Sequence, residues 1–412
     1  MKKLLALLLA VAMIACLFAG CSGDNEATEA PTDEVTEAPT DEAQPTDEPA
    51  PTEDNGVDYS AWRVAMITDY GDITDQSFNQ TTYEAGKAWC EARGVDFTYY
   101  KPTGDSTAER VAMIDAAVAE GYNVLLLPGF AFAGAIVETV ELYPDVTYIA
   151  LDVSEYDLQN AHGTADDFSW VYPSNLFSAV YQEEIAGYMA GYATVKLGYT
   201  KLGYLGGMAV PAVMRYGYGF VQGANAAAVE LGNTADVSIQ YVYGNQFYGD
   251  ADITAYMDTM YAGGVECVFA CGGGIFTSAG EAAAKVEGAK VVGVDVDQAP
   301  IIDTMFNVEG MTVTSAMKGL APTVNLLLTE LIENGNWADY SGKVVTLGLI
   351  SEVPEENYVQ IAPSTQFEDG KFTEEDYHQL VADIFNGKIT VSADTTAMPE
   401  TEITVKELGN IK

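Results

Sequence analysis

Short apolar runs alternate with helical patterns from residue 64 to residue 295, and this alternation restricts the chain to few folds. The runs at 64–68 and 124–128 are apolar without strict alternation, which is typical of strands that are covered on both faces. The pattern predicts strands at 64–68, 95–100, 124–128, 146–152, 201–205, 237–243, 266–271 and 290–295. It predicts helices between them at 75–94, 106–121, 131–142, 177–197, 215–231, 250–263 and 276–286.

The strand–helix–strand order occurs in two successive arrays, with a break at 161–173. Such arrays form parallel sheets with helices on both faces, so we expect an α/β fold of two doubly wound lobes. We assign the lobes as follows: 59–168 and 299–342 to the N-terminal lobe, 169–298 and 343–412 to the C-terminal lobe. A three-segment hinge is expected near 165–173, near Gln298 and beyond Lys343, and closure on it would bury a ligand.

The chain is strongly acidic, and this limits its partners. Its formal net charge is −43, and residues 59–412 carry 16 basic and 48 acidic side chains. Nucleic acids and anionic lipid surfaces are bound through cationic patches. The composition therefore argues against both as partners.

Motifs for catalysis and metal binding are absent from the sequence. The chain has only two histidines, His162 and His378, and its cysteines form no CxxC pair, which argues against a metal site and a Ser-His-Asp triad. It contains no GxxxxGK[ST] phosphate loop and no GxSxG motif. We therefore expect no cofactor, no metal and no enzyme activity. A glycosidase that uses paired carboxylates is the enzymatic alternative.

The N-terminal segment predicts export and a lipid anchor. Residues 1–20 contain two lysines, an apolar stretch and small residues before Cys21, as in a lipoprotein signal whose cysteine is acylated. Phe18 departs from the usual small or aliphatic residue, and an ordinary secretory signal is the alternative. Residues 21–58 hold four near-copies of Pro-Thr-Asp-Glu, 13 acidic residues and no Lys or Arg, which predicts a disordered tether. We expect a protein anchored by lipid to the extracytoplasmic face of the cell membrane.

Polar residues gather where the predicted strands end, and ligands of doubly wound folds bind beyond the carboxyl ends of strands. Asp69 and then Ser77-Phe78-Asn79-Gln80 follow the first strand, and Asp152 ends the fourth. In the second array, Cys271-Gly272-Gly273-Gly274 and Gly293-Val294-Asp295-Val296-Asp297-Gln298 end strands, and Thr314-Ser315-Ala316-Met317-Lys318 follows. These segments are the predicted ligand site.

In this order, the motifs resemble those of the basic membrane protein family of substrate-binding lipoproteins, whose better-known members are purine nucleoside receptors of ABC transporters. The resemblance covers 62 to at least 321 and is carried by SFNQ at 77–80, GVDxDQ at 293–298 and TSxxK at 314–318. It implies a type I periplasmic-binding-protein fold. It also implies a monomer that captures a nucleoside, with purines favoured, for uptake through the permease subunits of an ABC transporter.

The resemblance further implies a role for each motif residue. A base would lie between two aromatic rings, Phe78 and Phe247, with Tyr248 as the alternative second ring because this chain has one extra residue before the next aspartate. The ribose would be held by Asp295 and Lys318. The other ligand-binding residues that it implies are Asp69, Asn79, Asp152, Gly272 and Gly273. Gly274-Ile275-Phe276 departs from the Thr-Gly of many members, which affects the shape of the base pocket.

Each of these residues also has a purely structural interpretation. Phe78 is compatible with a buried aromatic at a helix start, the aspartates with helix caps, and Lys318 with a surface lysine. Further candidates for the rim of the site are Arg215, Tyr216 and Tyr218. Because function depends on the site rather than the fold, a receptor for a sugar or another small polar ligand is the alternative. A lipid-anchored ligand sensor is the alternative role.

Overall fold

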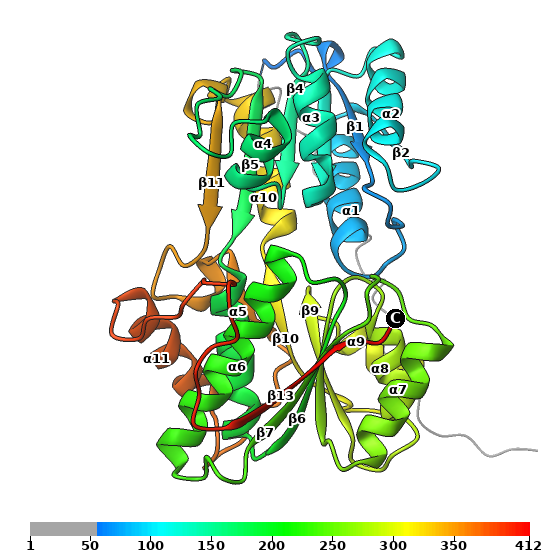
Figure 1. Ribbon diagram of the computed structural model, residues 1–412. Helices are drawn as coiled ribbons and strands as arrows, with labels where there is room; N and C mark the ends of the chain where they lie inside the picture. Colours follow the sequence, from blue (N-terminus) through cyan, green and yellow to red (C-terminus); the bar gives the residue numbers. More distant parts are fainter. Residues whose placement is uncertain (1–55) are drawn as a thin grey trace, which may run out of the picture. The chain divides into compact units, whose positions relative to one another are not determined.

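Two mainly parallel sheets organise the computed structural model, which describes residues 56–412 (Figure 1). The first sheet has the strand order β11-β5-β4-β3-β1-β2. Its strands are β1 (Arg63–Ile67), β2 (Asp96–Tyr100), β3 (Val124–Pro128), β4 (Thr147–Leu151), β5 (Leu176–Tyr181) and β11 (Lys343–Leu347). All of its neighbouring strands pair in parallel.

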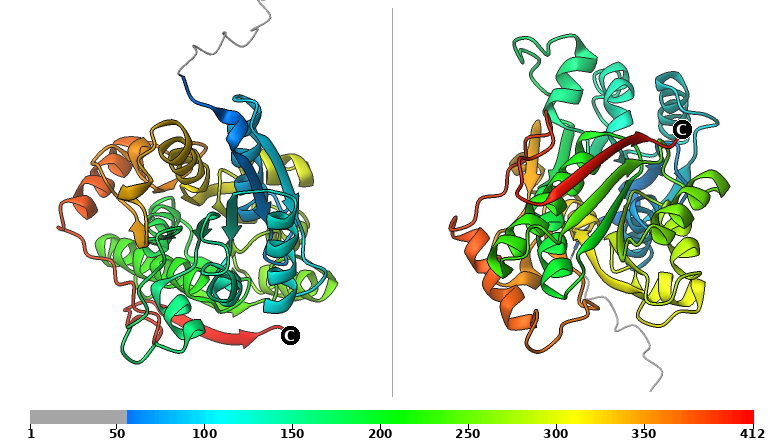
Figure 2. Two further views of the ribbon diagram at one scale, coloured as in Figure 1. Left: turned by 90° about the horizontal axis from the view of Figure 1, so that it is seen from above. Right: turned by 60° about the horizontal axis from the view of Figure 1, so that its bottom comes forward.

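The second sheet repeats this order and adds a strand at one edge. Its order is β12-β10-β9-β8-β6-β7-β13, in which β12 is antiparallel to β10. Strand β13, red in the right view of Figure 2, runs parallel along β7. Its strands are β6 (Lys201–Gly206), β7 (Ser238–Tyr243), β8 (Cys267–Cys271), β9 (Lys290–Asp295), β10 (Thr312–Lys318), β12 (Val359–Ile361) and β13 (Thr404–Asn410).

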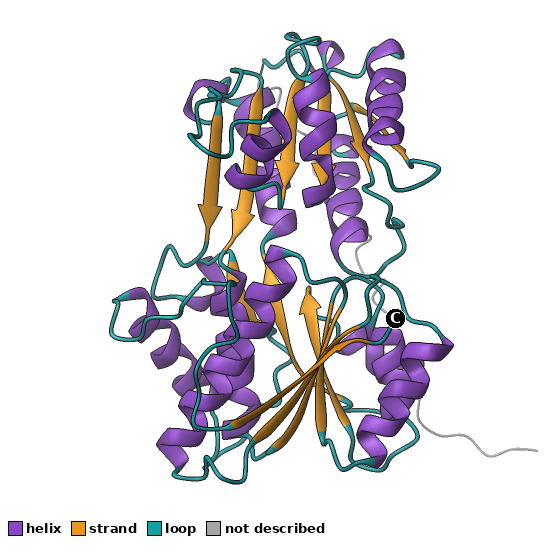
Figure 3. Cartoon of the chain, viewed as in Figure 1, coloured by secondary structure: helices purple, strands orange, loops and turns teal. Residues whose placement is uncertain are grey.

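Helices cover both faces of each sheet (Figure 3). With the first sheet they form the N-terminal lobe: α1 (Phe78–Glu91), α2 (Thr107–Ala119), α3 (Ala133–Thr139), α4 (Glu155–His162) and α10 (Leu320–Leu328). With the second they form the C-terminal lobe: α5 (Glu183–Lys196), α6 (Pro211–Leu231), α7 (Ala251–Ala262), α8 (Phe276–Ala283), α9 (Ala299–Phe306) and α11 (Glu374–Phe385). Every residue of β3 and β8 is buried, because helices lie on both sides. The predicted α/β class and the two doubly wound sheets are confirmed.

One predicted helix, at 177–197, is wrong. Its first part is strand β5, which pairs with β4, and the helix α5 begins only at Glu183. The sequence from Leu176 to Tyr181 is almost wholly buried, and its small and apolar residues suit a central strand as well as a buried helix. Periodicity alone therefore could not locate the change.

Sheet membership also corrects the predicted lobe boundaries. Strands β5 and β11 lie in the first sheet although their residues were assigned to the C-terminal lobe, and β10 lies in the second sheet although 312–318 was assigned to the N-terminal lobe. The predicted signal peptide at 1–20, Cys21 and nearly all of the tether at 21–58 lie outside the described residues.

The chain passes between the lobes after β5, after β10 and after β11, at Gln182, Gly319 and Gly348. Backbone hydrogen bonds link these passages. The Gln182 N–H donates to the Leu347 carbonyl (2.9 Å), and Tyr358 bridges the other two: its carbonyl accepts the Gly319 N–H (2.7 Å) and its N–H donates to the Gly348 carbonyl (3.0 Å). The crossings thus differ from the predicted hinge at 165–173, Gln298 and beyond Lys343, of which only the last lies close to a crossing. In the described part of the chain, no helix has both the length and the apolar character needed to cross a membrane.

Candidate ligand-binding cleft

A cavity of about 520 Å³ lies at the carboxyl ends of the strands, with lining residues from both lobes. In each sheet the strand order reverses around the first strand of the array, β1 or β6, which is where doubly wound folds bind ligands. All nine predicted ligand-binding residues line this cavity: Asp69, Phe78, Asn79, Asp152, Phe247, Gly272, Gly273, Asp295 and Lys318. The volume falls within the range of small-molecule sites.

The two lobes place equivalent residues at the cavity. Asp152 follows β4 and Asp295 ends β9, each at the fourth strand of its array, and both have a left-handed φ, +61° and +65°. Such a backbone conformation is uncommon for residues other than glycine, so it is held by the surrounding structure. The repeated geometry turns one carboxylate from each lobe toward the same lysine.

Lys318 is the centre of the charged end of the cavity. It is 6% exposed, and its Nζ lies 2.5 Å from Asp152 Oδ2, 3.5 Å from Glu183 Oε1 and 3.7 Å from Asp295 Oδ1. Burial lowers the pKa of Lys318, but attraction to these carboxylates outweighs burial and the net shift of the pKa is upward. Lys318 is therefore a buried cation and not a surface lysine.

Glu183 and Arg215 complete the charged end, and Glu183 was missed from the sequence. Arg215 Nε donates to Glu183 Oε2 (2.7 Å), and Glu183 is fully buried. Buried oxygens of Asp152 (Oδ1) and Glu183 (Oε1) have no hydrogen-bond partner in the described structure. Burial is the main reason why the pKa of Asp152 is raised, with Lys318 opposing it. The sequence did contain an indication of Glu183: two adjacent glutamates, Glu183 and Glu184, precede an apolar stretch, which is typical of the start of a helix.

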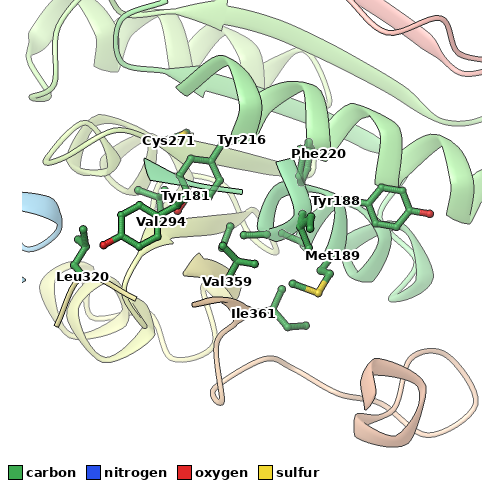
Figure 4. Packing of buried hydrophobic residues seen from close by; sticks show 14 of the residues in the cluster. Tyr181, Tyr188, Met189, Tyr216, Phe220, Cys271, Val294, Leu320, Val359 and Ile361 are labelled. Carbon is green, nitrogen blue, oxygen red and sulfur yellow. The ribbon is translucent and has the colours of Figure 1, made fainter. Parts of the chain in front are cut away.

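Close packing of α5 against α6 brings these charges together. A Cβ atom on Gly219 of α6 would lie 2.1 Å from the Glu184 carbonyl oxygen, so only glycine allows this approach. Lys318 Nζ lies 5.6 Å from the ring centroid of Tyr181 and 5.6 Å from that of Tyr216, and both tyrosines are labelled in Figure 4. The charged end is therefore packed against aromatic rings and against the close contact between α5 and α6.

The other end of the cavity is aromatic. Phe78 opens α1 in the N-terminal lobe, and Phe247 lies in the loop after β7 in the C-terminal lobe. The Tyr70 ring, also missed from the sequence, lies 6.1 Å from the Phe247 ring at an interplanar angle of 30°. Lys318 Nζ is 4.8 Å from the Phe78 centroid, so Phe78 adjoins the charged end.

Glycine backbone forms a wall of the aromatic end. Gly272 has a φ of +141°, and a Cβ atom there would lie 2.8 Å from Phe247 Cδ1. Gly273 has a φ of +50°, and a Cβ atom there would lie 2.8 Å from the Phe247 carbonyl oxygen, so this position also favours glycine. The neighbouring ring, Tyr248, lines the cavity but is 63% exposed. Geometry therefore favours Phe247 over Tyr248 as the inner ring.

Asp69 and Asn79 lie beside the rings and have structural partners. Asp69 Oδ1 accepts the N–H groups of Tyr70 and Gly71, both at 2.7 Å, so this carboxylate shapes the turn after β1. Burial raises the pKa of Asp69. Asn79 Nδ2 donates to Asp75 (3.1 Å), and its buried Oδ1 has no partner in the described structure. Both residues nevertheless contribute to the cavity wall.

Of the rim candidates, Arg215 and Tyr216 line the cavity. Tyr218 does not; it packs against Tyr241 of β7, with ring centroids 6.0 Å apart. In residues 56–412 no group of three or more His, Cys, Asp or Glu side chains is arranged to hold a metal ion. The carboxylates of the cleft are instead acceptors suited to hydroxyl or N–H donors of a ligand.

Fold and cleft together define a solute-binding protein of the periplasmic-binding-protein class. Residues 62–394 match the family described as ABC transporter substrate-binding protein, PnrA-like, and the chain belongs to this family.

Individual relatives agree with this membership. The chain is 25% identical to the ABC transporter nucleoside-binding protein BmpA of Lactococcus lactis subsp. cremoris over 57% of this chain and 64% of that protein. It is 27% identical to Basic membrane protein B of Borreliella burgdorferi over 72% of this chain and 81% of that protein.

Solved structures support the fold. A solute-binding protein of an ABC transporter system from Aeropyrum pernix matches with a TM-score of 0.59 at 20% identity, covering 80% of this chain and 87% of that one. A second solute-binding protein, from Conexibacter woesei, matches with a TM-score of 0.58 at 19% identity, covering 81% and 99%. The family match confirms the resemblance to the basic membrane protein family, and the solved structures confirm the periplasmic-binding-protein fold.

Proposed function

We propose that the protein captures a nucleoside, with purines favoured, in the cleft between its lobes and delivers it to the permease of an ABC transporter. The observation that supports this proposal is the division of one cavity into an aromatic end and a charged end. A nucleoside has the same division, because a flat apolar base is joined to a sugar rich in hydroxyls. The L. lactis relative is named as nucleoside-binding.

In this proposal the base stacks at the aromatic end. Phe78 and Phe247 come from opposite lobes and supply two ring faces, and stacking a base on an aromatic ring contributes roughly 1–3 kcal/mol. The bare backbone at Gly272 and Gly273 leaves room for a flat ring to approach. Asn79 Oδ1 and Asp69 accept hydrogen bonds from the edge of the base.

The ribose binds at the charged end. Asp152 and Asp295 accept from its hydroxyls, and Lys318 donates to them. A hydroxyl donor would satisfy carboxylate oxygens that otherwise lack a partner, and an unpaired buried acceptor costs roughly 1–3 kcal/mol. Nucleosides are uncharged, so the acidic protein does not repel them.

The N-terminal sequence suggests where this capture takes place. We propose that Cys21 is acylated after removal of residues 1–20 and that the acidic segment tethers a monomeric receptor, without enzyme activity, to the extracytoplasmic face of the membrane. Replacing Cys21 with alanine should abolish labelling by a radioactive fatty acid. Labelling that persists in this variant would contradict the proposed lipid anchor at Cys21.

A thermal-shift screen of nucleosides, bases and sugars tests the ligand class. A ligand at 100 times its Kd stabilises the folded protein by about 2.7 kcal/mol. We expect the melting temperature to rise most with purine nucleosides. Stabilisation by free sugars alone would favour the alternative of a sugar receptor, and the absence of stabilisation by any nucleoside would contradict the proposal.

A further inference from the structure

The start of α1 carries a serine that does not perform the usual role of its position. Ser77 occupies the N-cap of α1, where a serine hydroxyl normally accepts a backbone N–H. Here Asp75 does this instead: its Oδ1 accepts the N–H groups of Ser77 (2.9 Å) and Gln80 (3.1 Å), and its Oδ2 accepts that of Asn79 (2.9 Å). The Ser77 hydroxyl is therefore available for another partner.

That partner is Asp295, in the other lobe. Ser77 Oγ donates to Asp295 Oδ2 at 2.5 Å, and both residues are buried. One residue earlier, the Gln76 carbonyl accepts from Gln298 Nε2 at 3.1 Å. We call these two hydrogen bonds the cross-cleft latch.

Gln298 is held rigidly in the C-terminal lobe. It is fully buried, its Oε1 accepts the Val294 N–H (2.9 Å), and its own N–H donates to Ser315 Oγ (3.1 Å). The side-chain oxygen of Gln298, Oε1, is fixed by the N–H that it accepts, so its amide nitrogen, Nε2, is the atom that donates to the Gln76 carbonyl. Gln76 has a left-handed φ of +56°, uncommon for its residue type.

We propose that the cross-cleft latch sets the lifetime of the closed cleft. Its donors and acceptors lie in different lobes, so both hydrogen bonds form only when the lobes are together and stabilise that arrangement alone. Neither Ser77 nor Gln298 lines the cavity as described. Their acceptors, Gln76 and Asp295, do line it. The two donors therefore act on ligand release without contacting the ligand themselves, and this inference rests on the proposed function, capture of a solute between the lobes.

Ser77→Ala in the full-length chain is the direct test, with adenosine and adenine as probes. The variant loses a hydrogen bond to a charged group, so we expect the affinity for both probes to fall by a similar factor of roughly 10 to 100, mainly through faster dissociation. Gln298→Glu retains the acceptor for Val294 and removes the donor to Gln76. We expect it to act in the same direction.

Ser106→Ala is the matched control. Ser106 is also an N-cap serine, but it caps α2 in the ordinary way by accepting the Glu109 N–H. Its loss should lower the melting temperature by a few degrees, as expected for a lost helix cap, and leave the dissociation rates unchanged. Ser77→Ala should instead speed dissociation, and it leaves the cap of α1 in place because Asp75 retains it.

Small-angle X-ray scattering gives a readout that needs no ligand. We expect a larger radius of gyration for Ser77→Ala and Gln298→Glu than for the wild type and Ser106→Ala. If wild type binds neither probe, the proposed function fails while the scattering still tests the latch. Unchanged scattering with an unchanged dissociation rate would overturn the latch. A loss of affinity for adenosine alone would also overturn it, since Ser77 would then only orient Asp295 toward the sugar.

Discussion

The two ends of the cavity are built in different ways. The charged end is formed where strands end: Asp152 after β4, Asp295 at the end of β9 and Lys318 at the end of β10. The aromatic end is formed by a helix start and by loops, with Phe78 opening α1 and Phe247 in the loop after β7. Ion pairs at fixed strand ends orient a ligand, whereas stacking rings bind strongly and tolerate different bases. This difference predicts that the two ends respond differently to substitution.

The largest expected effect is on stability at the charged end. Lys318→Met leaves the carboxylates of Asp152, Glu183 and Asp295 buried without their shared cation. Breaking a buried ion pair in this way should lower the free energy of unfolding by about 3–5 kcal/mol, measured by urea denaturation. Lys371→Met is the control, because Lys371 and Glu368 form an exposed pair worth about 0–1 kcal/mol. Equal losses in the two variants would show that the cluster is not a buried ionic centre.

The charged end was also the more predictable from sequence. Asp152 and Asp295 come at the ends of short apolar runs that alternate with helical patterns, which predicts strands, and parallel strands bring their carboxyl ends to one edge. Glu183 was missed because the pattern from Leu176 to Lys196 has no visible change where β5 gives way to α5. The crossing at Gln182 was misplaced for the same reason.

The aromatic end was less predictable, because loop residues carry no periodic signal. The sequence left Phe247 and Tyr248 as alternatives, and the approach of Phe247 to Gly272 and the exposure of Tyr248 favour Phe247. Tyr70 was missed because nothing in its sequence position indicates a ring close to Phe247. The strands β11, β12 and β13 were not predicted either: β12 has three residues, and much of β11 and β13 is exposed at sheet edges.

The second largest expected effect is on ligand affinity at the aromatic end, and it tests which ring is the inner one. Phe247→Ala should weaken adenosine binding by roughly 1–3 kcal/mol, the size of one stacked base, as measured by calorimetry. Tyr248→Ala is the matched neighbour, and its exposed ring should contribute much less. A larger loss for Tyr248→Ala would reverse the assignment of the inner ring.

A third prediction concerns Glu184, which adjoins the charged end. Burial, with Glu183 adding to it and Arg215 opposing it, raises the pKa of Glu184 from its usual 4.5 to about 7. Between these values the folded protein keeps a proton that the unfolded chain has lost. Its free energy of unfolding should therefore fall as the pH rises, by up to about 1.4 kcal/mol per pH unit.

Glu184→Gln should remove this contribution, so the variant gains stability relative to wild type from about pH 5 to pH 7. Urea denaturation across this range measures the difference. The same substitution at the exposed Glu141 should leave the pH dependence unchanged. Parallel curves for wild type and Glu184→Gln would show that Glu184 titrates as an ordinary surface acid.

The smallest expected effect lies outside both ends. Deleting residues 24–55 removes most of the acidic repeats, which have too few large apolar side chains to form a core. The affinity of the purified protein for adenosine should stay within about threefold of that of the full chain, because a segment that cannot form a core has no packed structure to lose. A greater change would show that this segment contributes to the cleft.

The central claim is that one end of the cavity binds a base and the other its sugar, and calorimetry on wild type, Phe78→Ala and Lys318→Met tests it most directly. With adenosine, adenine and ribose as ligands, Phe78→Ala should weaken adenosine and adenine by the same factor. Lys318→Met should weaken adenosine at least about tenfold more than adenine, as expected for a lost hydrogen bond to a charged group. If Phe78→Ala weakens ribose as strongly as adenosine, or Lys318→Met weakens adenosine and adenine by the same factor, the division into a base end and a sugar end is contradicted.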